Sequence, residues 1–114
     1  MNLEINVTED SAKILVHLSG EIDVYTAPKL KDTLLQLTSN NGNDIQVDLS
    51  QVSYMDSTGL GVFISALKSA KESGSTVTLV NLRERVLRLF QITGLDQIID
   101  INLGERGVKS NGHF

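Results

Sequence analysis

The chain has 114 residues, of which 40% are hydrophobic and 21% charged, with a formal net charge of −4 and no cysteine. This length suits one globular domain, and the acidic balance argues against direct nucleic-acid binding, which usually needs a basic excess or stripe. Disulfides and thiolate metal sites are excluded; since no apolar run approaches the ~20 residues that cross a bilayer and the N-terminus lacks a signal-peptide pattern, we expect a cytoplasmic protein without a membrane segment.

Alternating apolar residues near the N-terminus predict a pair of strands. The apolar positions with a period of two are Leu3, Ile5 and Val7, then Ile14, Val16 and Leu18. Such a period is typical of a half-buried strand, and the polar segment 9–12 between the two runs indicates a turn. We therefore expect an antiparallel hairpin that Gly20 ends.

A first helix is predicted to follow the connection 21–25. Thr26 stands where an N-cap is expected, and Pro28 lies in the first turn, where its missing N–H is harmless. Apolar residues recur at helical spacing at Ala27, Leu30, Leu34 and Leu37. Breakers in segment 39–43 end this helix, and a third strand is predicted from the alternating Ile45, Val47 and Leu49.

The second half of the chain predicts two more helices around a strand at 76–80. The apolar stripe of the first of these helices consists of Leu60, Phe63, Ile64, Leu67 and Ala70, and Gly74 closes it. Asn81 with Glu84 three residues later indicates the N-cap of the next helix, which Gly94 ends. Segment 95–101 stays open between a last helical turn and a closing strand.

This order of elements predicts an α/β protein with a mixed β-sheet. The N-terminal hairpin is antiparallel, whereas strands that flank a helix are expected to be parallel because β-α-β connections are right-handed. The helices should lie mostly on one face. We expect a single domain over 1–103, followed by a flexible C-terminal tail at 104–114, which is polar and without periodicity.

Catalytic, metal and dinucleotide sites find little support. Ser57 would need a base, and the histidines, His17 in a strand and His113 in the tail, are poorly placed candidates. No His pair stands at ligand spacing and the carboxylates are scattered, so we expect neither a metal nor a cofactor. The glycines of segment 59–61 would need a third glycine at Ile64 for a dinucleotide fingerprint.

The most informative segment lies where the third strand should hand over to the central helix. Its residues are Asp56, Ser57, Thr58, Gly59 and Leu60. At a helix N-terminus the backbone N–H groups lack partners and the dipole is positive. The two hydroxyls can therefore be ordinary caps, or one can be a phosphoacceptor whose phosphate the helix start accommodates. Both interpretations stay open on the pattern alone.

Three segments together resemble conserved blocks of the STAS domain, specifically that of bacterial anti-sigma factor antagonists. Segment 20–26 (GEIDVYT) resembles the first block, 52–61 (VSYMDSTGLG) the phosphorylation block and 89–95 (LFQITGL) the C-terminal block. The resemblance spans nearly the whole chain. It implies the STAS, or SpoIIAA-like, fold of order β-β-α-β-α-β-α-β-α, whose final short helix the periodicity does not reveal.

The resemblance also implies a function in regulating transcription, as in a stress response. The unphosphorylated protein is expected to bind an anti-sigma factor that is also an ATP-dependent serine kinase, which releases the sigma factor. The kinase phosphorylates the serine after the aspartate, here Ser57, and the complex dissociates; a PP2C-type phosphatase reverses this. Thr58 is not the preferred acceptor. Such a protein would have no catalysis of its own and would be a monomer or weak dimer.

The resemblance places six residues around the phosphosite: Asp23, Tyr25, Asp56, Thr58, Gly59 and Leu60. We expect the two aspartates to put negative charge near the acceptor, and Gly59 to leave room for a partner. Tyr54 and Met55 stay open between interface and core. Two other functions also stay open: a STAS scaffold of a large stress-signalling complex, and a domain that binds a nucleotide or small ligand at the helix start.

Overall fold

The computed structural model describes residues 2–40 and 42–102. Its elements, in chain order, are β1 (Leu3–Asp10), β2 (Lys13–Ile22), α1 (Ala27–Thr38), β3 (Asp44–Met55), α2 (Ser57–Ser73), β4 (Thr76–Val80), α3 (Glu84–Thr93), the 3₁₀ helix η1 (Leu95–Gln97) and β5 (Asp100–Asn102). The predicted tail at 104–114 and the final helix implied by the family both lie outside the described residues.

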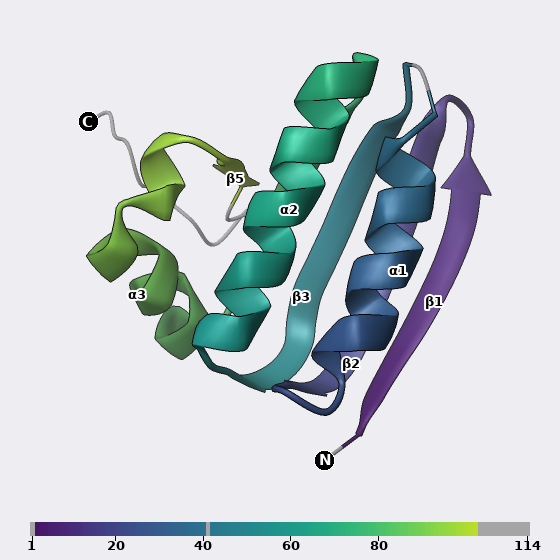
Figure 1. The fold of residues 1–114 in the computed structure, drawn as a ribbon. Helices are drawn as coiled ribbons and strands as arrows, with labels where there is room; N and C mark the ends of the chain where they lie inside the picture. The colour runs from purple at the N-terminus through teal and green to yellow at the C-terminus, as the bar shows by residue number, and fades with distance from the viewer. Residues whose placement is uncertain (1, 41, 103–114) are drawn as a thin grey trace.

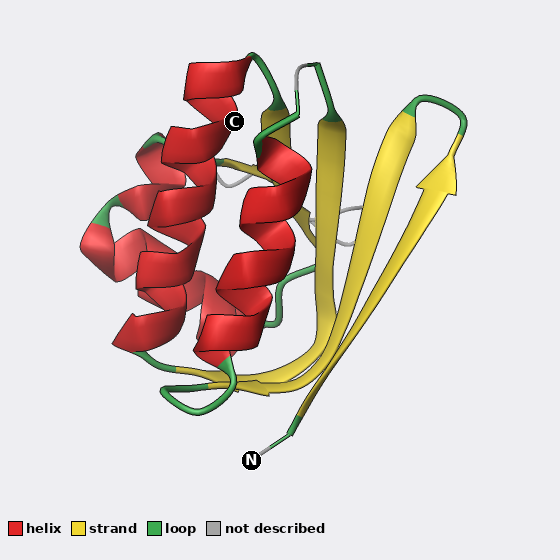
Figure 2. Cartoon of the chain, turned by 45° about the vertical axis from the view of Figure 1, so that its right-hand side comes forward, coloured by secondary structure: helices red, strands yellow, loops and turns green. Residues whose placement is uncertain are grey.

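The described strands form one sheet in the order β1-β2-β3-β4-β5. β1 pairs antiparallel with β2, whereas β2–β3, β3–β4 and β4–β5 are parallel, which confirms the predicted mixed sheet. Figure 2 shows the helices together on one face, also as predicted. Because each of β2, β3 and β4 leads directly into a helix, α1, α2 and α3 all begin at the same edge of the sheet (Figure 1).

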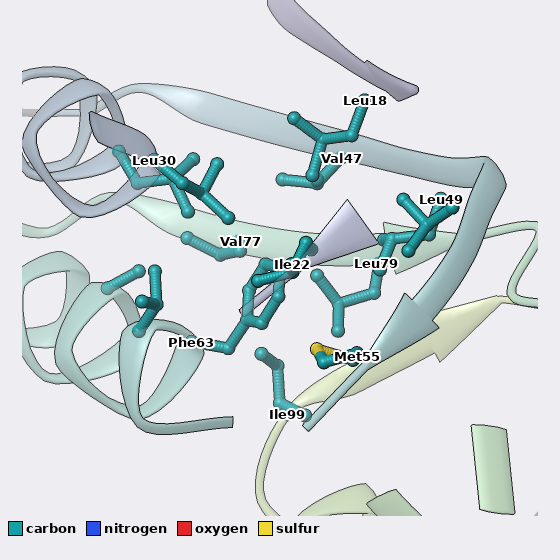
Figure 3. Packing of buried hydrophobic residues seen from close by; sticks show 14 of the residues in the cluster. Leu18, Ile22, Leu30, Val47, Leu49, Met55, Phe63, Val77, Leu79 and Ile99 are labelled. Carbon is teal, nitrogen blue, oxygen red and sulfur yellow. The ribbon is translucent and has the colours of Figure 1, made fainter. Parts of the chain in front are cut away.

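The hydrophobic core fills the space between the sheet and the helices. Val16, Val47 and Leu79 are paired across three strands and are fully buried. The helix layer meets them with Phe63 and Phe90, whose rings lie 6.0 Å apart at 58°; Figure 3 shows Phe63 reaching toward the sheet residues. No helix in the described part of the chain is both long enough and apolar enough to cross a membrane.

The prediction that Gly20 ends the second strand is wrong. β2 continues through Gly20 to Ile22, and shifts in its register with β3 lie between His17 and Ser19 and between Gly20 and Glu21. Gly20 has φ +128°, and a Cβ there would lie 2.2 Å from the carbonyl oxygen of Asn2. That oxygen accepts the Glu21 N–H at 2.9 Å. Glycine is needed here for close backbone approach, not for termination.

The predicted cap at Asn81 is also wrong. α3 begins three residues later, with Arg83 at its N-cap position and no side-chain cap bond. Asn81 has φ +59°, and its N–H donates to the Asn102 carbonyl oxygen at 3.1 Å, which ties the end of β4 to β5. The ambiguous segment 95–101 contains both candidates in succession, the helical turn η1 and the strand β5. The predicted closures at Gly74 and Gly94 are confirmed by left-handed φ values.

We predict that Gly20→Ala destabilises the fold by about 3 kcal/mol, because it combines a strained φ with a collision against backbone that cannot rotate away. Gly74→Ala is the matched control, since φ is +77° but nothing lies within 4 Å of the added Cβ. Its cost should be about 1 kcal/mol. Urea unfolding of both variants measures the difference, and equal costs would contradict the steric argument.

Candidate functional site

The N-terminus of α2 is capped by a carboxylate. Asp56 has extended backbone (φ −113°, ψ −170°), and its Oδ1 accepts the Thr58 N–H at 3.0 Å. Its carbonyl oxygen accepts the N–H groups of Gly59 and Leu60 at 3.0 and 3.4 Å. On the sequence alone the hydroxyls of Ser57 and Thr58 are candidate caps, but the cap is Asp56, and neither hydroxyl is needed to start the helix.

Ser57 is the first residue of α2 and its side chain is exposed. Among the described residues, none forms a hydrogen bond with its hydroxyl. A helix N-terminus offers a favourable dipole to a negative group. The position thus combines a free, accessible hydroxyl with surroundings that tolerate a phosphate.

A second carboxylate organises the turn before α1. Asp23 is 5% exposed, and its Oδ1 accepts the N–H groups of Tyr25 and Thr26 at 2.9 and 3.0 Å. Thr26 Oγ1 accepts the Asp23 N–H and donates to the Glu21 carbonyl oxygen, both at 2.9 Å. Thr26 occupies the N-cap position as predicted, but its side chain makes no cap bond, because its hydroxyl faces back into this turn.

The two helix starts are held next to each other by the sheet. Ile22 and Met55 are paired at the ends of the parallel strands β2 and β3, and the Asp56 N–H donates to the Ile22 carbonyl oxygen at 3.3 Å. The turn at 23–26 therefore lies beside segment 56–58. This neighbourhood joins the first and second sequence blocks, which are separated by 25 residues in the chain, into one site.

An open groove runs between the first turns of α1 and α2. Its lining includes Val24, Pro28 and Lys31 on one side and Thr58 and Gly61 on the other. Val24 is 58% exposed, which is unusual for valine. Sequence reasoning missed Val24; the available signal was an apolar residue inside an otherwise polar turn.

Tyr25 is the most exposed large hydrophobic residue described, at 82%. It follows Val24 in the turn, but the two side chains line different hollows. Val24 lines the groove with Thr58, whereas Tyr25 lines a hollow on the β1 side with Leu3 and Lys29. Tyr54, which stayed open between interface and core, is also 41% exposed, whereas Met55 is buried (Figure 3). Of the residues predicted around the phosphosite, Tyr25, Thr58 and the partly exposed Asp56 remain accessible.

The other three predicted site residues, Asp23, Gly59 and Leu60, are buried. They support the site from beneath and do not offer side chains to a partner. For Gly59 the reason for glycine is internal: a Cβ there would lie 2.5 Å from Met55 Cγ and 2.8 Å from Ile22 Cγ2. The space that Gly59 leaves is filled by the core, which corrects the expectation that it makes room for a partner.

Within the described residues, which do not include His113, the structure does not assemble a Ser-His-Asp triad. His17 Nδ1 lies 3.5 Å from Asp48 Oδ2. On β2, however, His17 lies five residues before Ile22, and Ile22 pairs with Met55, which is two residues before Ser57. That separation is about 17 Å along a strand. Over residues 2–40 and 42–102 no cluster of three or more His, Cys, Asp or Glu side chains could hold a metal ion.

Known proteins are similar to this chain over nearly its whole length. A family model described as "Mlab, STAS domain" matches residues 5–102. The anti-sigma-B factor antagonist of Bacillus subtilis (strain 168) is 48% identical over 107 residues, which cover 94% of this chain and 97% of that protein.

Solved structures have the same fold. An anti-sigma factor antagonist from Mycobacterium paratuberculosis superposes with a TM-score of 0.76 at 26% identity, over 92% of this chain and 89% of that one. Unphosphorylated SpoIIAA, at 14% identity, has a TM-score of 0.62 over 83% of this chain and 97% of its own, and it supports the fold alone.

We predict unequal stability effects for substitutions at two neighbouring residues. Asp56→Ala removes the cap bond to Thr58 and should lower the free energy of unfolding by about 1 kcal/mol. Ser57→Ala removes an exposed hydroxyl without a partner, so the change should stay within about 0.5 kcal/mol. Chemical denaturation of both variants checks this. A large loss for Ser57→Ala would show that its hydroxyl has a structural role.

The two glycines of α2 provide another matched pair. Gly59→Ala forces a Cβ into Met55 and Ile22 and should cost about 2 kcal/mol, somewhat less if the flexible Met55 side chain moves aside. Gly61→Ala meets nothing within 4 Å, and it should stabilise the helix by up to about 1 kcal/mol because alanine is the better helix former. Thermal unfolding under identical conditions compares them, and the same sign for both would refute the packing account.

Proposed function

The chain belongs to the STAS domain family, and from this membership we propose that it is an anti-sigma factor antagonist switched by phosphorylation at Ser57. In its unphosphorylated form it binds an anti-sigma factor that is also a serine kinase, and the sigma factor is released. Phosphorylation ends the complex and a PP2C-type phosphatase restores it. The observation that carries the proposal is the exposed Ser57 hydroxyl, left without a partner because Asp56 provides the cap.

The helix start makes Ser57 a suitable acceptor in physical terms. A phosphate adds a charge of about −1.5 to −2 at neutral pH, and the positive end of the α2 dipole compensates part of it. Because the hydroxyl makes no contact that the fold needs, its modification leaves Asp56 capping the helix. The switch therefore acts through the surface that Ser57 shares with a partner and does not require unfolding.

The proposed partner surface consists of Val24, Tyr25 and Thr58 with the groove between α1 and α2. Val24 and Tyr25 are exposed apolar side chains on a turn made rigid by the Asp23 and Thr26 hydrogen bonds. A rigid apolar anchor binds with a smaller loss of conformational entropy. A phosphate placed next to that anchor must be desolvated or repelled on binding, which disfavours the complex.

In this proposal the chain is the substrate of its partner and performs no reaction itself, and it acts in the cytoplasm. The kinase active site supplies the base and the nucleotide. The chain itself positions the Ser57 hydroxyl. Ser57 lies on the first turn of α2, and the start of this helix is fixed to the sheet by the hydrogen bond from the Asp56 N–H to the Ile22 carbonyl oxygen. The kinase must therefore approach along the N-terminal end of α2.

We predict that Ser57→Ala retains affinity for the anti-sigma factor kinase within about twofold but accepts no phosphate. The wild type should lose affinity by about 100-fold or more on phosphorylation, since ~1.4 kcal/mol corresponds to tenfold and like-charge juxtaposition costs several. Calorimetry with the purified kinase measures both affinities, and mass spectrometry maps the phosphate.

Thr58→Ala is the control for site choice and should still accept phosphate at Ser57. Phosphate found on Thr58 in the Ser57→Ala protein would overturn the assignment of the acceptor. Undiminished affinity of the phosphorylated wild type would overturn the switching mechanism while leaving the acceptor correct.

A further inference from the structure

β1 is an edge strand of the described sheet and its outer edge has no partner strand there. The helices cover the sheet from one side, and Figure 1 shows β1 beyond α1 at the margin of the molecule. As a result, the helix-side face of β1 is incompletely covered: Val7 is 42% exposed, and Leu3 and Ile5 are only partly buried. An open edge with apolar side chains on one face can pair with another strand.

We propose that this edge pairs antiparallel with β1 of a second copy of the chain, about a twofold axis that passes between the two Asn6 residues. The sheet then continues across both copies, and the helices of both lie on the same face. Such an isologous contact is the commonest symmetry of soluble homo-oligomers. This inference goes beyond the proposed function and does not depend on it.

The charges of β1 select this register. With Asn6 opposite Asn6 of the second copy, Glu4 lies opposite Thr8 and Glu9 opposite Leu3, so no two carboxylates face each other. A register centred on Val7 would set Glu4 against Asp10, and like charges directly opposite are destabilising. Centring on Ile5 avoids this conflict but leaves Glu9 and Asp10 beyond the paired region.

The apolar side chains agree with the same register. Ile5 lies opposite Val7 of the second copy. Both side chains point to the helix side, because Ile5 pairs with Leu18 and Val7 pairs with Val16 on β2, and these two partners are buried in the core. Directly opposed residues of an antiparallel pair have Cβ atoms about 4.5–5.5 Å apart. Pairing thus covers the exposed part of Val7 with an isoleucine side chain, twice per dimer.

A lysine completes the charge complementarity. Lys29 of α1 lines a hollow together with Leu3, Ile5 and Tyr25. In the proposed register, Glu9 of the second copy lies opposite Leu3. Since Glu9 and Leu3 are on the helix side of β1, the Glu9 carboxylate is directed toward Lys29. Within the part of the chain that the structure describes, neither Glu9 nor Lys29 has an ion-pair partner.

The contact is small. It uses one eight-residue strand of each copy with the adjoining start of α1, fewer than the roughly 20–30 residues a side of a standard interface. We therefore expect a reversible dimer that forms at high protein concentration. Ser57 begins a different element and takes no part in the contact, so its phosphorylation should leave the dimer unchanged.

Disulfide trapping tests the register, because the natural chain has no cysteine. Asn6→Cys places two thiols directly opposite each other, within reach of a disulfide after small adjustment. In Thr8→Cys, the matched control on the same face, the thiols would lie about 14 Å apart. Under mild oxidation Asn6→Cys should form covalent dimers at least about tenfold faster. Equal rates would overturn the register.

Charge reversal tests the dimer itself by sedimentation equilibrium up to millimolar concentration. The wild-type average mass should rise above the 12.4 kDa of the monomer. Glu9→Lys should abolish the rise, and the double variant Glu9→Lys/Lys29→Glu should restore it. Both residues are exposed, so thermal unfolding should confirm intact folds. A wild type that stays at monomer mass, or a double variant without recovery, would refute the proposal. Ser57 phosphorylation, assayed on the same variants, tests the proposed function separately.

Discussion

The parallel pairing of β2 with β3 is the constraint on which the candidate site depends. It ends with Ile22 beside Met55 and with the hydrogen bond from the Asp56 N–H to the Ile22 carbonyl oxygen. Since both strands end at one edge, α1 and α2 begin side by side (Figure 1). The turn that carries Val24 and Tyr25 then borders the turn that carries Ser57. Residues of both turns, Val24 and Thr58 among them, line the groove of the proposed partner surface.

At this edge of the sheet, two carboxylates accept the backbone N–H groups of the turns, so the Ser57 hydroxyl is not needed for capping. Asp23 and Asp56 each use one side-chain oxygen to accept backbone N–H groups two or three residues ahead. Buried Gly59 then lets the first turn of α2 sit directly on Met55 and Ile22. The result is a helix start whose cap does not involve the side chain of Ser57.

Much of the fold could be predicted because its signals are local. Period-two and helical apolar patterns located the main strands and helices, and the glycines at 74 and 94 ended two helices where expected. The errors came where distant chain segments meet. The sequence predicts a strand end at Gly20, but the conformation of this glycine allows the backbone of Asn2 to approach closely. It predicts a helix cap at Asn81, but the N–H of this residue donates a hydrogen bond to β5. Neither contact leaves a trace in the neighbouring sequence.

The sequence by itself determined the kind of protein and its candidate acceptor, because the segment from Asp56 to Leu60 combines a hydroxyl with helix-start residues and matches a family block. It could not decide which group caps the helix or which site residues are accessible. Only the tertiary structure did so: it gave the cap to Asp56, buried Asp23, Gly59 and Leu60, and brought Val24 to the surface beside Thr58. The reason is physical, since exposure and hydrogen-bond competition depend on which strands pair, and pairing joins residues that the chain keeps far apart.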